Sequence, residues 1–179
     1  MDLMAPYLSE QQERENIRHN AQLIFAATGK RPQGWINPRA TPSPHTSRLL
    51  AEEGYGWHGD TLSDDLPYSL QFGAHSIIAI PGTMEVNDLP LFNHRQPPDA
   101  FIRTFEGWLN YVLKYDGGAV KIDPSIHAHC YGRPGGIWAL DRVMEIAQAT
   151  NELWIGTRGE VAEHVRQYFA AADRLNTTQ

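Results

Sequence analysis

The sequence predicts an α/β fold built on a mostly parallel sheet, and two observations carry this prediction. Segments with apolar residues at helical spacing alternate with short extended apolar segments along the chain. No repeat, linker or low-complexity stretch interrupts its 179 residues. A helix between two strands returns the chain to the same edge of the sheet, so the strands pair in parallel. We therefore expect a single domain over residues 1–179 with one buried core.

The first half of the chain contains signals for helix ends and for short strands. Ser9 and Gln12 form a capping box that begins a helix, and Gly29 ends it. Ser43 begins a second helix that stops at Gly54. Three short apolar runs predict strands at residues 35–36, 55–58 and 76–80.

The second half continues the alternation of helices and strands. Asp99 begins a helix that breaks at Gly117, and further helices are expected at 137–149 and from the capping box of Thr157 and Glu160 to about residue 175. Strands are expected within 119–126 and at 153–156. The chain opens on a helix, whereas a doubly wound sheet or a barrel normally begins with a strand. An upstream part is therefore expected to be missing.

The composition of the chain argues against nucleic acid and membranes as binding partners. The chain carries 21 acidic and 15 basic residues, a net charge of -6, which argues against nucleic acid as a main partner. No apolar run approaches the ~20 residues of a membrane-spanning helix, so no membrane partner is expected. Cys130 is the single cysteine and allows no internal disulfide, which favours the cytoplasm.

Polar residues gather where the predicted strands end, which is where parallel α/β folds bind ligands. We expect one shared pocket there. The candidates are Asn37 and Arg39, His58 and Asp60, Glu85, Asn87 and Asp88, and His127, His129 and Arg133.

His127 and His129 form the sharpest local motif. Alternate residues of a strand face the same side, so both imidazoles can act together as metal ligands or as an acid and its partner. A histidine pair satisfied by backbone groups is the alternative. Asp60 can hold a histidine in one tautomer, or it can cap a turn. Cys130 is expected to be a buried, inert thiol, and Trp35 can line a pocket wall.

Five segments, taken in order, together cover nearly the whole chain from about Ser9. They are TGKRPQGWINPRATPSPHTSRLLAEEGYGWHGD (28–60), DDLPY (64–68), IPGTMEVNDLPLF (80–92), IHAHCYGRPGGIWALDRVMEIA (126–147) and LWIGTRGEVAEH (153–164). In this order they resemble the polysaccharide deacetylases (the NodB-homology, carbohydrate esterase 4-like group), in the allantoinase-like, metal-independent branch.

The resemblance implies the C-terminal portion of a distorted (β/α)7 barrel and hydrolysis of a carbon–nitrogen bond other than a peptide bond. The substrate would be a small amide or an N-acetylated sugar. His127 matches the family's general acid, and Asp60 matches the acid that orients that histidine. The residues expected to bind substrate are Glu85, Asn87, Asp88, Trp35, His129 and Arg133.

The family's first half has no counterpart in this sequence. It carries a T-F-D-type aspartate and an H-x3-H pair, which supply the general base and the ligands of a divalent metal such as zinc. No metal ligand or other cofactor is therefore assigned here. One alternative is a catalytically incomplete fragment that acts only with a partner chain, or an inactive homologue. Another is a self-contained metal hydrolase that uses His58, Asp60, His127 and His129. An open parallel sheet leaves an edge strand uncovered, so a homo-oligomer is expected.

Overall fold

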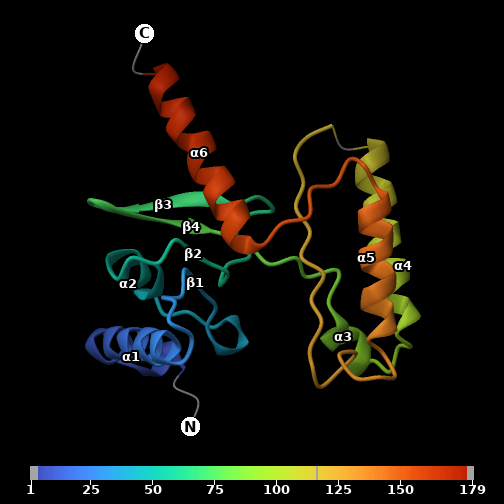
Figure 1. The fold of residues 1–179 in the computed structure, drawn as a ribbon, viewed down its shortest axis with the longest axis horizontal. Helices are drawn as coiled ribbons and strands as arrows, with labels where there is room; N and C mark the ends of the chain where they lie inside the picture. The colour runs from blue at the N-terminus through green and yellow to red at the C-terminus, as the bar shows by residue number, and fades with distance from the viewer. Residues whose placement is uncertain (1–3, 116, 177–179) are drawn as a thin grey trace. The chain divides into compact units, whose positions relative to one another are not determined.

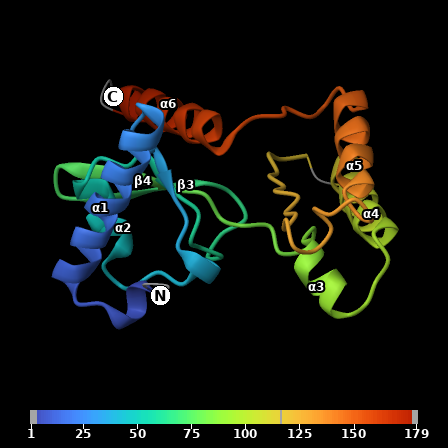
Figure 2. The same ribbon diagram turned by 60° about the horizontal axis from the view of Figure 1, so that its bottom comes forward.

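The computed structural model describes residues 4–115 and 117–176. It divides the chain into two compact units (Figures 1 and 2). Met1–Pro81 and Gly156–Gln179 form the first, which we call the sheet unit, and Gly82–Ile155 forms the second, which we call the helical unit. The single domain expected over residues 1–179 stays a prediction.

The sheet unit contains four strands in the order β1-β2-β4-β3. β1 pairs with β2 and β2 with β4 in parallel, whereas β3 and β4 form an antiparallel hairpin. A mixed α/β fold with a mainly parallel sheet is thus confirmed. The hairpin partner β3 was not expected, since the sequence before it reads as irregular. The strands are β1 (Gly34–Trp35), β2 (Trp57–His58), β3 (Tyr68–Phe72) and β4 (His75–Ala79).

The described part of the sheet unit contains three α-helices, and capping places the ends of the first. Before α1, the Ser9 hydroxyl accepts from the Gln12 backbone, while the Gln12 side chain accepts from the Ser9 backbone at 2.9 Å. Gly29 then adopts φ 69°, a left-handed conformation that suits glycine. Both helix ends agree with the prediction. The helices are α1 (Glu10–Thr28), α2 (Thr46–Glu52) and α6 (Arg158–Asn176), with short 3-10 turns at Ala5–Tyr7 and Pro38–Ala40.

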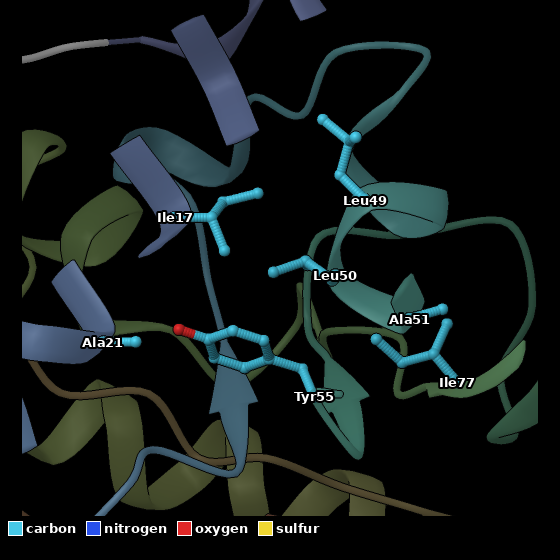
Figure 3. Close-up of a cluster of buried hydrophobic side chains, with 7 residues drawn as sticks. All are labelled: Ile17, Ala21, Leu49, Leu50, Ala51, Tyr55 and Ile77. Carbon is cyan, nitrogen blue, oxygen red and sulfur yellow. The ribbon is translucent and has the colours of Figure 1, made fainter. Parts of the chain in front are cut away.

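Alternation along β4 builds a three-layer core. Ile77 points to one face of the sheet, where it packs among buried residues of α1 and α2 (Figure 3). Ile78 and Ile80 point to the other face and pack against Ala162 of α6. The sheet therefore lies between α1 and α2 on one side and α6 on the other (Figure 1).

The helical unit is organised around α4 and α5, which pack against each other. Phe101, Phe105 and Val143 are almost completely buried in its core. Phe101 and Phe105 lie one turn apart on α4, so the same face of this helix carries both into the core. The helices are α3 (Asp88–Asn93), α4 (Asp99–Tyr115) and α5 (Trp138–Ala149).

The two strands expected late in the chain are wrong. Residues 119–126 and 153–156 form no strand, and only a single parallel bridge joins Asn87 to Ser125. Pro124 has no N–H group to donate, which limits pairing in the first segment. In the second, Trp154 and Ile155 are exposed rather than packed into a sheet.

None of the helices in the described ranges has the combination of length and apolar character that crossing a membrane requires.

Candidate active site

A parallel bridge between Asn87 and Ser125 brings Asp88 to His127. The Asp88 N–H donates to the Ser125 carbonyl at 3.1 Å, and the Ser125 N–H donates to the Val86 carbonyl at 2.8 Å. Two segments that lie 39 residues apart in the chain therefore run side by side. Asp88 is the first residue of α3, whose N-terminus Asn87 caps through its side-chain oxygen, which accepts from the Leu89 N–H at 3.0 Å.

The Asp88 carboxylate is completely buried and accepts three hydrogen bonds. Oδ2 accepts from the backbone N–H groups of His127, at 2.9 Å, and of Tyr131, at 3.0 Å. Oδ1 lies 2.6 Å from Nδ1 of the His127 ring. A buried carboxylate requires such partners, because removing its charge from water is costly. These contacts fix both the position of Asp88 and the orientation of the imidazole.

His127 consequently has one ring nitrogen engaged and one available. An ionised carboxylate only accepts hydrogen bonds, so Nδ1 carries the proton in this pair, and Nε2 is the ring nitrogen that Asp88 does not engage. The His127 side chain is 36% exposed, which leaves it accessible. A half-exposed imidazole held by a buried carboxylate has the geometry of an acid–base group.

The other predicted residues of this unit lie around the pair in different ways. His129 is exposed, and its ring lies edge-on to that of His127 with the centroids 5.6 Å apart. Glu85 and Arg133 are also exposed. The Asp88 carboxylate accepts from His127 and Tyr131, and its expected place in the substrate pocket stays a prediction.

The backbone carbonyl of His127 closes the loop that follows this residue. The His127 C=O accepts from the N–H groups of Cys130 and Gly132, each at 3.0 Å. This turn buries Cys130, and burial raises the pKa of its thiol, as expected for an inert cysteine. A Cβ at Gly132 would lie 2.7 Å from the Ala128 Cα and 2.9 Å from the His127 oxygen. Glycine is therefore required here by close backbone approach.

Gly132→Ala is expected to destabilise the helical unit by about 2 kcal/mol, because backbone atoms cannot move aside as a flexible side chain can. Gly135→Ala is the matched control in the same loop, since a Cβ there meets nothing within 4 Å. Urea unfolding of both variants measures the difference. Equal stability of the two variants would contradict the packing described for Gly132.

Asp60 lies in the sheet unit, directly after β2, and its partner there is Asn37. Its carboxylate accepts from the Asn37 backbone N–H at 2.8 and 3.0 Å and from the Asn37 side-chain amide at 2.8 Å. Burial raises the pKa of Asp60, and the hydrogen bonds from Asn37 oppose that rise. Its expected pairing with His127, which belongs to the other unit, stays a prediction. The sequence marked Asn37 as a polar residue at a strand end but not as the partner of Asp60.

Two further sheet-unit residues have mainly internal contacts. Trp35 packs edge-on against Tyr55, with ring centroids 5.7 Å apart, at the border of the core. His58 is buried, with Nδ1 accepting from the Asp60 N–H at 3.3 Å and Nε2 lying 3.2 Å from the Ser47 hydroxyl. Burial lowers the pKa of His58, which keeps this imidazole neutral.

Lowering the pH from 7 to 5 is expected to destabilise the sheet unit through His58. Its folded pKa lies below the ordinary 6.5, so the folded chain binds fewer protons here than the unfolded chain does. The stability due to this residue is therefore present above pH 6.5 and is lost as the pH falls toward the folded pKa. Urea unfolding of His58→Gln should show a shallower pH dependence than the parent chain, while exposed His75→Gln keeps the parent slope. Identical slopes for all three would contradict this.

Metal binding requires several ligands in one place. Within residues 4–115 and 117–176, no three His, Cys, Asp or Glu side chains gather in a way that could hold a metal ion.

Comparisons with known proteins bear on this arrangement. No protein-family model matches the chain. The chain is 26% identical over 173 residues to a protein of Schizosaccharomyces pombe named "Putative polysaccharide deacetylase", an alignment that covers 84% of this chain and 53% of the relative. The chain thus spans about half the length of the curated relative that it matches.

Solved structures show the same likeness. A "probable Polysaccharide deacetylase" from Pseudomonas aeruginosa PAO1 superposes with a TM-score of 0.80 at 28% identity, over 92% of this chain and 56% of that one. The structure titled "Puue Allantoinase" superposes with a TM-score of 0.77 at 29% identity, over 92% of this chain and 55% of that one. The predicted resemblance and the predicted fold class are both confirmed.

Proposed function

From the fold and sequence pattern that this chain shares with polysaccharide deacetylases and an allantoinase, we propose that it takes part in hydrolysis of a carbon–nitrogen bond other than a peptide bond, with His127 as the general acid. One observation carries the proposal. The His127 ring is held through Nδ1, at 2.6 Å, by a carboxylate that is completely buried, while the imidazole itself remains accessible.

In this reaction a water oxygen adds to the carbonyl carbon of an amide, and the C–N bond then breaks. The departing nitrogen takes a proton from Nε2 of the imidazolium form of His127, because an amide anion is too basic to leave unprotonated, and the ring is left neutral with its remaining proton on Nδ1. Asp88 is a positioning residue: it fixes the tautomer with the proton on Nδ1 and stabilises the imidazolium form. The group that removes a proton from the attacking water is not assigned to a residue of this chain.

The remaining predicted residues are proposed in supporting roles. Asp60, held by Asn37 directly after β2, stays the proposed partner of His127 on the strength of the family resemblance. Glu85, Asn87, Trp35, His129 and Arg133 stay proposed substrate contacts. The proposed substrate is a small amide or an N-acetylated sugar, and the sugar would place the protein in carbohydrate metabolism. A cytoplasmic location is proposed because the chain has a single cysteine.

An alternative proposal is that the chain acts only together with other polypeptide, either a second copy of itself or a separate partner chain. This alternative is supported by length: the alignment covers 53% of the Schizosaccharomyces pombe relative and 56% of the Pseudomonas aeruginosa structure. In that case His127 and Asp88 supply the acid side of a site that the other polypeptide completes.

Acetate release from N-acetylglucosamine oligomers and ring opening of allantoin test the proposal on the purified chain. The parent chain is expected to be active on one of them, His127→Gln inactive, and His19→Gln unchanged, since His19 is an exposed residue of α1. Full activity of His127→Gln would overturn the assignment of the acid. Activity that arises only on adding a second polypeptide would favour the partner-chain alternative.

A further inference from the structure

The helical unit contains an open hollow of about 740 Å³, which is within the usual size range of small-molecule sites. It adjoins the loop that carries His127, since Cys130 and Tyr131 belong to its wall. Its polar and aromatic lining comprises Phe92, Asn93, Arg95, Gln96, Tyr131 and Arg133.

The charge of this hollow is opposite to that of the chain as a whole. Two arginines line it and no acidic residue does, although the chain carries a net charge of -6. Within the described ranges, neither Arg95 nor Arg133 forms an ion pair. Two guanidinium groups without acidic partners at one hollow favour an anion, and the planar guanidinium matches the two oxygens of a carboxylate.

The backbone of Arg95 adds an independent observation. Arg95 has φ 53°, in the left-handed region that glycine and asparagine occupy at lower cost than a long side chain. The turn after α3 holds it there: the Arg95 N–H donates to the Phe92 carbonyl at 3.0 Å and the Gln96 N–H to the Leu91 carbonyl at 2.9 Å. An arginine at a position that suits glycine points to a role for its side chain.

The aromatic residues that line the hollow indicate what kind of ligand would fit beside the two arginines. The Phe92 and Tyr131 rings lie edge to face with their centroids 6.3 Å apart, and the Tyr131 hydroxyl donates to the Gln96 carbonyl at 2.6 Å. With its hydroxyl engaged, Tyr131, which is only 4% exposed, adds no free polar group to the hollow, whereas Phe92 is 48% exposed. An accessible aromatic ring beside two cations suits a flat apolar body with a negative end.

We propose that this hollow binds a small aromatic carboxylate, with Arg95 and Arg133 against the carboxylate and the exposed Phe92 ring, which packs on Tyr131, against its body. The hollow shares Arg133 with the proposed substrate contacts, but binding of a carboxylate there goes beyond the proposed hydrolytic reaction. Its occupancy is measurable without any turnover, so loss of activity and loss of benzoate binding are distinguishable.

Calorimetric titration of the full chain with benzoate and with benzamide tests the charge requirement, because the two probes share one shape and differ in charge. We expect benzoate to bind at least tenfold more tightly than benzamide, and inorganic phosphate to compete only weakly. Arg95→Gln and Arg133→Gln should each weaken benzoate about tenfold, as expected for the loss of a charge-assisted hydrogen bond. Arg142→Gln, an exposed α5 arginine paired with Glu145, should leave it unchanged.

Arg95→Gly separates a ligand role from a structural one. Glycine relieves the left-handed backbone, so the melting temperature is expected to rise while benzoate binding is lost. Equal binding of benzoate and benzamide would overturn the proposal. So would a phosphate affinity equal to that of benzoate, or equal binding by Arg95→Gln, Arg133→Gln and Arg142→Gln.

Discussion

Asp88→Asn is expected to lower the rate of the proposed hydrolysis by about 10³-fold, an effect of the size seen when a histidine-orienting carboxylate is lost. The amide nitrogen of asparagine can donate to Nδ1 of His127, which would favour the tautomer with its proton on Nε2 and remove the negative charge that stabilises the imidazolium. The same change removes a charged acceptor from the backbone N–H groups of His127 and Tyr131. We therefore also expect a loss of about 3 kcal/mol in the free energy of unfolding.

Nitrogen NMR of the labelled imidazole measures the tautomer of His127 directly and does not depend on turnover. The parent chain should show the proton on Nδ1, and Asp88→Asn should shift it toward Nε2. Asp141→Asn is the matched control, because Asp141 is an exposed acidic residue of α5 in the same unit. An unchanged His127 spectrum in Asp88→Asn would contradict the positioning role.

Leu50→Ala is expected to destabilise the sheet unit by about 3 kcal/mol. Leu50 lies in α2 and is completely buried. It packs with Ile17 of α1 and with Tyr55, on the face of the sheet from which Ile77 projects (Figure 3). Truncation removes buried apolar surface and leaves a cavity that the surrounding helices and strands fill only in part. The loss should be visible in urea unfolding followed by circular dichroism.

Leu23→Ala provides the control for this prediction. Leu23 is also a helical leucine of the sheet unit, but its side chain is 55% exposed. Its truncation should change the free energy of unfolding by no more than about 0.5 kcal/mol. Similar losses in the two variants would show that the core does not lie where Figure 3 places it.

Local chemistry made the helices predictable. The Ser9–Gln12 box and Gly29 mark helix ends through hydrogen bonds and backbone freedom that involve only nearby residues. The strands were less predictable, because a strand exists only where a second segment pairs with it. Residues 119–126 have the composition of a strand but form only the bridge at Ser125, whereas β3 forms because β4 lies beside it.

The sequence alone determined the fold class and the α-helices other than α3, and it proposed His127 as the residue most suited to acid–base chemistry. These follow from capping, from apolar periodicity and from the ordered segments that resemble a family. Tertiary structure alone decided that Asp88 is the carboxylate in contact with His127. That pairing depends on two segments 39 residues apart that meet through a parallel bridge. It also depends on burial, because a carboxylate removed from water must accept hydrogen bonds from the three donors around it. Neither condition is encoded by spacing along the chain.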